Sequence, residues 1–446
     1  MSEAQEITLK VVRPTDGEGL TITNGSTFVI GAVSPPQAKV TVNGVAAEVS
    51  DDGAFLAFAP VQPLPKPQTV KLASGKSERV DAVFECLARA GQKQFRRQIF
   101  VALPPARKPK EPPIEVFEKP LLYQIKEEQI LSRTNWGLLH LPAGGRVAVE
   151  ARRGSELRLR LIDSQETWLH EAKLSQVREP FPVPVPGMAG RSNRYKVGIP
   201  IGSLLPYTVQ QQPGSFLVGV TVHYPDSNEP CLVPNPPSPR WGFSTRFEGT
   251  SLLINLRRPL DLSIGLRNKT ICLDPGHNPD PGAIGPRGLE EREANLKVGL
   301  ALEKLLTAAG ANVVFTHRDE PLPLLERRAA VLKHNPDILV SLHNNSVPDG
   351  TDPRTSHGTS TFYYHPQSKP LADAVHAAML KGLGLPDLKV SQKSLYVCRI
   401  SECPAILVEP TFIILPEHEK LLMSEAGQQK IARAIFEGIK DFFERR

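Results

Sequence analysis

The pattern of apolar residues changes once along this chain, close to Asn268, and the two patterns are typical of different fold classes. Before about residue 260 the chain carries most of its 43 prolines, with short apolar runs separated by turn residues, which is typical of β domains. From Asn268 onward, strand-like apolar runs alternate with amphipathic segments of helical period. The sequence therefore predicts a multidomain protein: all-β N-terminal modules, then an α/β domain with a mostly parallel sheet over residues 266–446.

The first module and the segment after it differ in composition. Residues 1–103 contain short strand-like runs broken by Asn43-Gly44 and by Asp51-Asp52-Gly53, so we expect an immunoglobulin-like β-sandwich. Residues 104–120 hold six prolines with Lys and Glu between them. Such a composition stays extended and buries no core, so we expect a linker there.

Residues 121–265 form a second β-rich region that we expect to contain two sub-units. The first, about 121–180, resembles a bacterial Src-homology-3-like barrel. The proline-rich run 182–187 separates it from a second β module at about 190–265, in which residues 216–222 have the pattern of a buried strand. Modules of this kind either bind ligands and partners or have a plain structural role, and both readings stay open.

The composition argues against several classes of protein. The net charge of +6 is a mild excess whose strongest cluster lies in the proline-rich linker, so we expect no nucleic-acid partner. No stretch reaches the roughly 20 apolar residues of a transmembrane helix. The five cysteines have no metal-site spacing, and the residues Met1 to Glu6 lack the features of a secretory signal.

Polar residues that can carry chemistry follow the predicted strands of the α/β domain. We expect strands at residues 270–273, 312–316, 337–342, 359–364 and 405–408. His277 follows the first strand through a turn, His343 ends the third, and Glu409 ends the fifth. Because open α/β sheets bind ligands beyond the carboxyl ends of their strands, these three side chains should converge at one edge of the sheet.

A fourth residue, Glu291, lies at the start of a predicted helix over residues 290–309, on the side of its apolar stripe. Together with His277 and His343 it makes a set of two imidazoles and one carboxylate, the ligand pattern of catalytic zinc with an open fourth position. A lone His at a strand end is more often a surface or hydrogen-bonded residue, and the chain has eleven His. The surrounding sequence therefore decides between the two readings.

Four segments surround these residues in chain order: Leu273-Asp274-Pro275-Gly276-His277, Glu291 with Asn295-Leu296, Val340-Ser341-Leu342-His343-Asn344-Asn345, and Pro404-Ala405-Ile406-Leu407-Val408-Glu409. On these segments, the chain from Asn268 to its end resembles the zinc-dependent N-acetylmuramoyl-L-alanine amidases of bacterial cell-wall remodelling. The resemblance implies that His277, Glu291 and His343 hold one zinc ion per chain and that Glu409 is the catalytic acid and base. It also implies that the substrate is the peptidoglycan amide bond between N-acetylmuramic acid and L-alanine.

Further expectations concern the substrate and the partners. We expect Asn278, Asn345, His357 and His365 to line the substrate groove; Asn278 stands where the family usually has Gly. The alternatives are a catalytically silent peptidoglycan-binding scaffold and a zinc hydrolase of another amide bond, because the fold and a His₂Glu set do not define the leaving group. We expect the protein to be located in the cell envelope, either periplasmic or extracellular. A cell-wall or divisome regulator is a candidate partner of the β modules.

Overall fold

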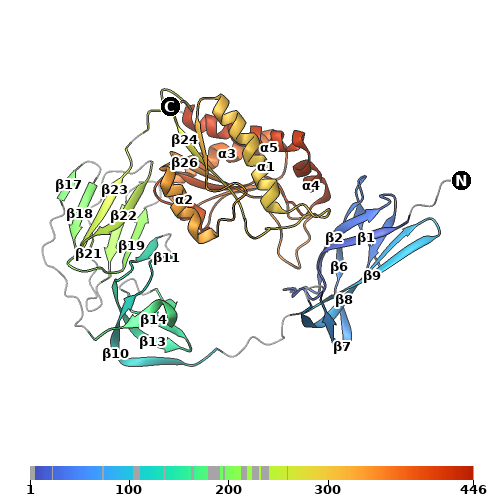
Figure 1. The fold of residues 1–446 in the computed structure, drawn as a ribbon, viewed down its shortest axis with the longest axis horizontal. Coiled ribbons are helices and arrows are strands. Elements are labelled where there is room, and N and C mark those ends of the chain that lie inside the picture. The colour runs from blue at the N-terminus through green and yellow to red at the C-terminus, as the bar shows by residue number, and fades with distance from the viewer. Residues whose placement is uncertain are drawn as a thin grey trace.

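The computed structural model describes residues 6–22, 24–72, 75–103, 111–133, 137–161, 165–178, 191–193, 196–211, 218–223, 231–232, 241–258 and 260–444 (Figure 1). Two antiparallel sheets form the first β module, with strand orders β1-β2-β6-β5 and β4-β3-β8-β7, and β9 pairs with β8. They share one apolar core, so residues 6–103 form a β-sandwich, called here the first sandwich. Its strands are β1 (Thr8–Arg13), β2 (Ser26–Ser34), β3 (Lys39–Val42), β4 (Val45–Ala46), β5 (Glu48–Val49), β6 (Ala54–Pro60), β7 (Gln62–Lys71), β8 (Ser77–Ala90) and β9 (Lys93–Val101).

The next sheet begins inside the predicted linker. Residues 104–110 lie outside the described residues, but Ile114 is already in β10 and pairs with Arg153. The linker prediction was therefore wrong for residues 114–120, because the segment pairs with a strand further along the chain, which its own composition does not reveal. The sheet has the order β15-β14-β13-β10-β16. Its elements are β10 (Ile114–Ile125), β13 (Arg146–Arg153), β14 (Glu156–Leu159), β15 (Thr167–His170), the 3₁₀ helix η1 (Glu171–Lys173) and β16 (Leu174–Gln176).

The predicted division of the second β-rich region near residues 180–190 is crossed by strand pairing. Leu138 of β12 pairs with Val209 of β19, so the two predicted sub-units share a sheet of order β11-β12-β19-β20-β21. All of β12 is buried, which a strand at the edge of a separate small barrel would not be. The proline-rich run 182–187 lies outside the described residues, as do 216–217 of the predicted buried strand. The remaining strands are β11 (Gln129–Ser132), β12 (Leu138–Leu141), β17 (Arg191–Asn193), β18 (Lys196–Pro200), β19 (Tyr207–Gln211), β20 (Val218–Val222), β21 (Cys231–Leu232), β22 (Phe243–Glu248) and β23 (Ser251–Leu256), with β17-β18-β23-β22 as a further sheet.

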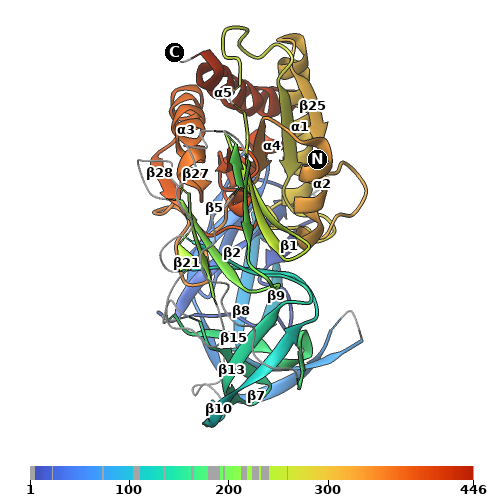
Figure 2. The same cartoon turned by 90° about the vertical axis from the view of Figure 1, so that its left-hand side faces the viewer.

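The C-terminal part of the chain is an α/β domain with a mixed sheet of order β25-β24-β26-β29-β27-β28. The central strands β24, β26 and β29 are parallel to one another, and β27 is antiparallel to β29. Figure 2 shows β25 beside α1 toward one edge, and β27 and β28 beside α3 toward the other. The strands are β24 (Thr270–Pro275), β25 (Asn312–Phe315), β26 (Ile338–Leu342), β27 (Thr359–Tyr363), β28 (Asp387–Gln392) and β29 (Ala405–Glu409). The helices are α1 (Glu291–Ala308), η2 (Leu324–Glu326), α2 (Arg327–His334), η3 (Pro366–Ser368), α3 (Lys369–Leu383), η4 (Val397–Arg399), α4 (Pro416–Met423) and α5 (Glu425–Glu444).

Five of these six strands were predicted, and β28 was not. Its sequence is mostly polar and exposed, because it lies at the edge of the sheet and needs no apolar face. The predicted first helix ends as expected, with Gly310 at a positive φ of 87° directly after the last turn. None of the described helices is long and apolar enough to cross a membrane.

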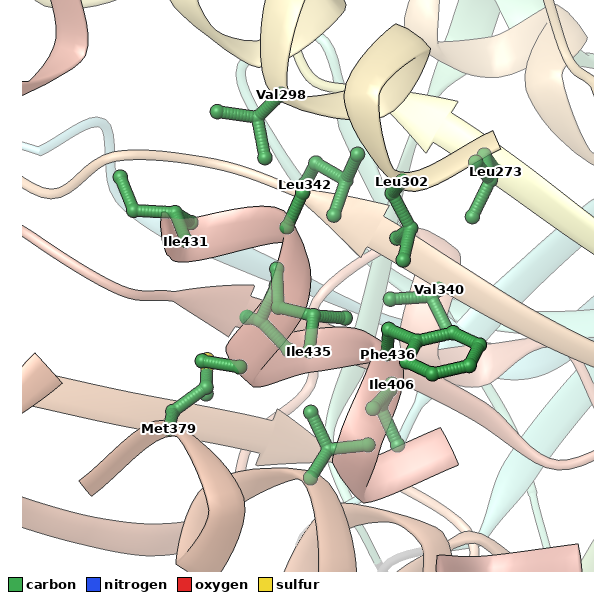
Figure 3. Packing of buried hydrophobic residues seen from close by; sticks show 14 of the residues in the cluster. Leu273, Val298, Leu302, Val340, Leu342, Met379, Ile406, Ile431, Ile435 and Phe436 are labelled. Carbon is green, nitrogen blue, oxygen red and sulfur yellow. The ribbon is translucent and has the colours of Figure 1, made fainter. Parts of the chain in front are cut away.

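Alternate residues of the central strands pack on opposite faces of the sheet. Leu273, Val340 and Ile406 belong to the core beneath α1, α3 and α5, where Figure 3 shows them beside Leu302 of α1 and Phe436 of α5. Their neighbours Cys272, Leu339 and Leu407 belong to a second cluster, which also contains Val331 of α2 and Leu138 of β12. Burial on both faces explains why these strands are apolar throughout, and it leaves the polar chemistry to the strand ends.

Candidate metal centre

The carboxyl ends of β24 and β26 bring His277 and His343 beside Glu291 at the start of α1. One ligand atom from each of the three side chains lies within 4.8 Å of the others. Nε2 of His277 is 3.0 Å from Oε2 of Glu291, and Nδ1 of His343 is 3.0 Å from Oε1. The structure therefore brings together the three residues that the sequence predicts as a ligand set.

Glu291 is the buried member of this cluster, with a side chain only 6% exposed. Its two oxygens also accept hydrogen bonds from the backbone amides of Ala283, at 3.0 Å, and Asn344, at 3.1 Å. Burial by itself raises the pKa of Glu291, but the hydrogen bonds and charges of the two histidines lower it below the ordinary value. A buried carboxylate held charged between two imidazoles is a donor set suited to a divalent cation.

Two glycines provide the space that the three candidate ligand side chains occupy. A Cβ at Gly276 would lie 2.3 Å from the ring of His343. A Cβ at Gly282, whose φ is +68°, would lie 2.6 Å from Oε2 of Glu291 and 2.6 Å from Cδ2 of His277. Both positions therefore need a residue without a side chain for the three ligands to approach one another.

Glu409 lies at the end of β29, next to the strand that precedes His343. The backbone amide of His343 donates to the carbonyl of Val408 at 3.0 Å, which fixes the two strand ends side by side. Within the described residues, Oε2 of Glu409 is buried and has no hydrogen-bond partner. Burial, followed by the negative charge of Glu291, raises the pKa of Glu409 well above its ordinary value, and Lys393 opposes this shift. A half-buried glutamate with one buried, unpartnered oxygen, next to a candidate metal centre, is a candidate for proton transfer.

Residues that the sequence did not single out support the first ligand. Nδ1 of His277 is 2.5 Å from Oδ1 of Asp280, so the other nitrogen of the ring faces Glu291. Burial lowers the pKa of His277, but the carboxylates of Glu291 and Asp280 raise it above the ordinary value. The backbone carbonyl of His277 accepts a hydrogen bond from the guanidinium of Arg327, which also pairs with Asp274 at 2.9 Å. A carboxylate shortly after a candidate ligand is the one sequence signal that could have indicated Asp280.

The four predicted groove residues make different contacts in the structure. Asn278, with φ of +67°, donates its side-chain amide to the carbonyls of Asp319 and Glu320 at 3.3 and 3.2 Å. Asn345 follows Asn344 directly in the loop after His343, and its side chain accepts from the amide of Ser346 at 2.8 Å.

The two histidines differ in burial. His357 is half-buried, with its ring 5.7 Å from that of His418. His365 is only 3% exposed, contacts the carbonyl of Arg399 through Nε2 at 2.9 Å and packs on Phe243. A packing role accounts for His365, and the structure does not place it at the candidate metal centre.

The fold and the site together define an α/β domain with a candidate His₂Glu metal centre and a half-buried glutamate beside it, the arrangement of metal-dependent hydrolases. Comparison with known proteins gives the family. The family model described as N-acetylmuramoyl-L-alanine amidase matches residues 271–441. The uncharacterized protein YqiI of Bacillus subtilis is 33% identical over 185 residues, which are 40% of this chain and 87% of that protein. This chain belongs to the N-acetylmuramoyl-L-alanine amidase family.

The chain is also similar to proteins with amidase names. The probable cell wall amidase LytH of Staphylococcus epidermidis is 30% identical over 195 residues, which are 42% of this chain and 64% of LytH. The match thus spans less than two thirds of that relative's length. Among solved structures, the catalytic domain of the amidase CwlV from Bacillus (Paenibacillus) polymyxa var. colistinus is 30% identical, with a TM-score of 0.37, and the match covers 40% of this chain and 99% of that domain.

Proposed function

We propose that this protein is a zinc-dependent N-acetylmuramoyl-L-alanine amidase that hydrolyses the amide bond between N-acetylmuramic acid and L-alanine in peptidoglycan. The observation that carries the proposal is the convergence of His277, Glu291 and His343 within 4.8 Å, in a chain of the amidase family. Such an enzyme would remodel the cell wall and would be located in the cell envelope.

The donor set fits zinc rather than a harder cation. Calcium and magnesium prefer sites made of oxygen atoms alone, whereas two imidazole nitrogens and one carboxylate are the ligands of catalytic zinc sites. Three protein ligands leave a position for water or substrate. When bound, zinc would polarise the scissile carbonyl and acidify a water molecule at the site.

The chain itself would supply positioning and proton transfer. Glu291 accepts hydrogen bonds from the amides of Ala283 and Asn344, which would keep its carboxylate in position as a ligand. Oε2 of Glu409 has no partner among the described residues, so no other protein group there would compete for the proton that this carboxylate would accept from the attacking water. Glu409 would then donate this proton to the nitrogen of L-alanine as the amide bond breaks, and its raised pKa suits the acid step.

The test is release of stem peptides from purified peptidoglycan by the full-length protein loaded with zinc. Two controls accompany it: protein treated with a chelator, and a Glu409→Gln variant that should still bind zinc. Peptides with a free N-terminal alanine, absent from both controls, would establish the amidase. Zinc binding without any release would favour a wall-binding scaffold, and cleavage at another bond would leave the metal centre but remove the proposed substrate.

A further inference from the structure

The three candidate ligands lie in, or directly after, two loops at the same edge of the sheet. The first ligand loop, residues 276–290, runs from β24 to α1, with His277 near its start and Glu291 directly after its end. The second ligand loop, residues 343–358, runs from β26 to β27 and begins with His343. Loops on a protein surface are more mobile than the strands they connect, so the geometry of the centre depends on what holds these two segments.

The first sandwich holds the second ligand loop through Asp349. Oδ1 of this carboxylate accepts a hydrogen bond from Nη2 of Arg13 at 3.1 Å, and Oδ2 accepts one from the backbone amide of Thr21 at 3.0 Å. The Asp349 side chain is only 10% exposed, whereas that of Arg13 is 38% exposed. Both oxygens of one loop residue are thus bound by the sandwich.

The next residue of the same loop, Gly350, is bound on both sides of its backbone. Its amide donates to Oγ1 of Thr27 at 3.1 Å, and its carbonyl accepts from Nδ2 of Asn24 at 2.7 Å. Thr27 is 1% exposed, and Gly350 has a positive φ of 80°. The sandwich therefore satisfies the polar backbone of the loop at a point where its conformation is unusual.

The first ligand loop is held by the same sandwich from another side. Nη1 of Arg287 is 2.7 Å from Oδ2 of Asp52, and it also donates to the Asp52 carbonyl at 3.2 Å. The backbone amide of Arg287 donates to the carboxylate of Glu419 on α4. The adjacent residue Lys420 pairs with Asp51 of the sandwich at 2.7 Å. An acidic turn of the sandwich thus meets basic residues on the loop and on the helix that supports it.

An apolar patch lies at the centre of this interface. Phe28, Ile30 and Leu56 of the sandwich are at most 1% exposed. They belong to the same packed cluster as residues of both ligand loops, Leu289 and Val347. The Asp51–Lys420 pair has side chains 77% and 53% exposed and contributes little by itself. The interface therefore depends mainly on the apolar patch, to which the hydrogen bonds of Asp349 and Gly350 add.

We propose that the first sandwich is a positioning element of the metal centre: it clamps the two ligand loops so that His277, Glu291 and His343 stay at ligand distance. The inference rests on the proposed zinc site but not on the identity of the substrate. Its physical basis is preorganisation, because a loop that is already fixed loses less conformational freedom when it binds a metal. The residues that act through the loops are Thr27 and Asp52 on the sandwich, and Asp349 and Arg287 on the loops.

The experiment uses the full chain with the substitutions Thr27→Val and Asp349→Asn, made separately and together. Thr27→Val keeps the shape of the side chain and removes the acceptor for the Gly350 amide. The dissociation constant for Zn²⁺ is measured by competition with a chromophoric chelator, in the absence of peptidoglycan. We expect zinc binding to weaken by about tenfold in the double variant, with faster amide hydrogen exchange in residues 343–358.

The matched control is Asp373→Asn, which removes one charge from an ion pair with Lys369 on α3, away from the sandwich contacts. This variant should bind zinc as the unaltered protein does. Unchanged zinc affinity and unchanged exchange in the double variant would overturn the proposal and reduce the sandwich to a tether. The proposed reaction is judged separately: if the unaltered protein binds zinc but releases no stem peptide, the proposed function fails, while the zinc affinity of the variants still tests the clamp.

A charge exchange covers the case in which the first variants fail to fold. Asp52→Arg and Arg287→Asp each place like charges opposite one another at the ion pair between the first sandwich and the first ligand loop. Each single change should weaken zinc binding, and the two together should restore it because the ion pair re-forms with reversed polarity. Equal zinc affinity in the single and double variants would overturn the proposal.

Discussion

Asp280 and His277 form a hydrogen bond of 2.5 Å between Oδ1 and Nδ1, on the side of the ring that faces away from Glu291. This carboxylate selects the tautomer in which Nδ1 carries the proton, which leaves Nε2 free to bind a metal. The pair therefore sets the orientation of one ligand without belonging to the ligand set.

Replacing Asp280 by alanine should weaken zinc binding by about 10-fold to 100-fold, because the imidazole loses its orienting partner. Chelator competition with the full-length protein measures the dissociation constant. Asp319→Ala, which removes an exposed carboxylate from a neighbouring loop, is the control and should have no effect. Zinc affinity that is equal in the two variants would show that Asp280 does not orient His277.

Gly282→Ala should abolish zinc binding, because the added methyl would occupy space 2.6 Å from both Glu291 and His277. Part of any effect comes from the positive φ, which costs an alanine about 1 kcal/mol. Gly384→Ala isolates that part: Gly384 has φ of +70° with no atom within 4 Å of its added Cβ. Gly282→Ala should lose more stability in urea unfolding than Gly384→Ala, because only its methyl group overlaps neighbouring atoms, and only Gly282→Ala should lose zinc. Retention of zinc by Gly282→Ala would contradict the packing described for this centre.

Arg327→Met should destabilise the α/β domain by about 3 to 5 kcal/mol, because it leaves the buried carboxylate of Asp274 without its cation. The two side chains are 3% and 0% exposed, and Arg327 also binds the carbonyls of Pro275 and His277. Urea unfolding measures the change. Lys369→Met, in an exposed helical ion pair, should change the free energy of unfolding by less than about 0.5 kcal/mol. A change in Arg327→Met as small as that would contradict the assigned role.

The free energy of unfolding should fall as the pH falls from about 6.5 to about 4, in part because of His365. Burial lowers the pKa of this histidine to about 4, against an ordinary value of 6.5. The unfolded state therefore binds more protons than the folded state in this window, and stability is lost as the solution becomes acidic. The full effect of one such group is up to about 3 kcal/mol.

The variant His365→Gln keeps a donor for the carbonyl of Arg399 and cannot be protonated, so its stability should decline less between these pH values. Urea unfolding at a series of pH values compares it with the unaltered protein. The control is His334→Gln, at an exposed position at the end of α2. If the two variants show the same pH dependence, burial of His365 is not a source of the acid sensitivity.

Much of the α/β domain could be predicted because its sequence signals are local or periodic. Apolar runs such as 270–273 and 405–408 have the length of buried strands, and the stripe through Val298 and Leu302 has the helical period. The edge strand β28 was missed since exposed strands lack that signal. The linker and module boundaries were wrong where strands pair across long sequence distances, as Leu138 does with Val209.

The sequence by itself determined which residues can carry chemistry, because parallel strands place their carboxyl ends at one edge, so that residues after β24, β26 and β29 must meet there. Only the tertiary structure decided how that edge is supported. Arg13 and Asp349 are 336 positions apart, and Asp52 and Arg287 are 235 apart, so no period or motif links them. Their contacts exist because the folded sandwich presents a shape and charge that match the two ligand loops, and such complementarity appears only when both domains are built.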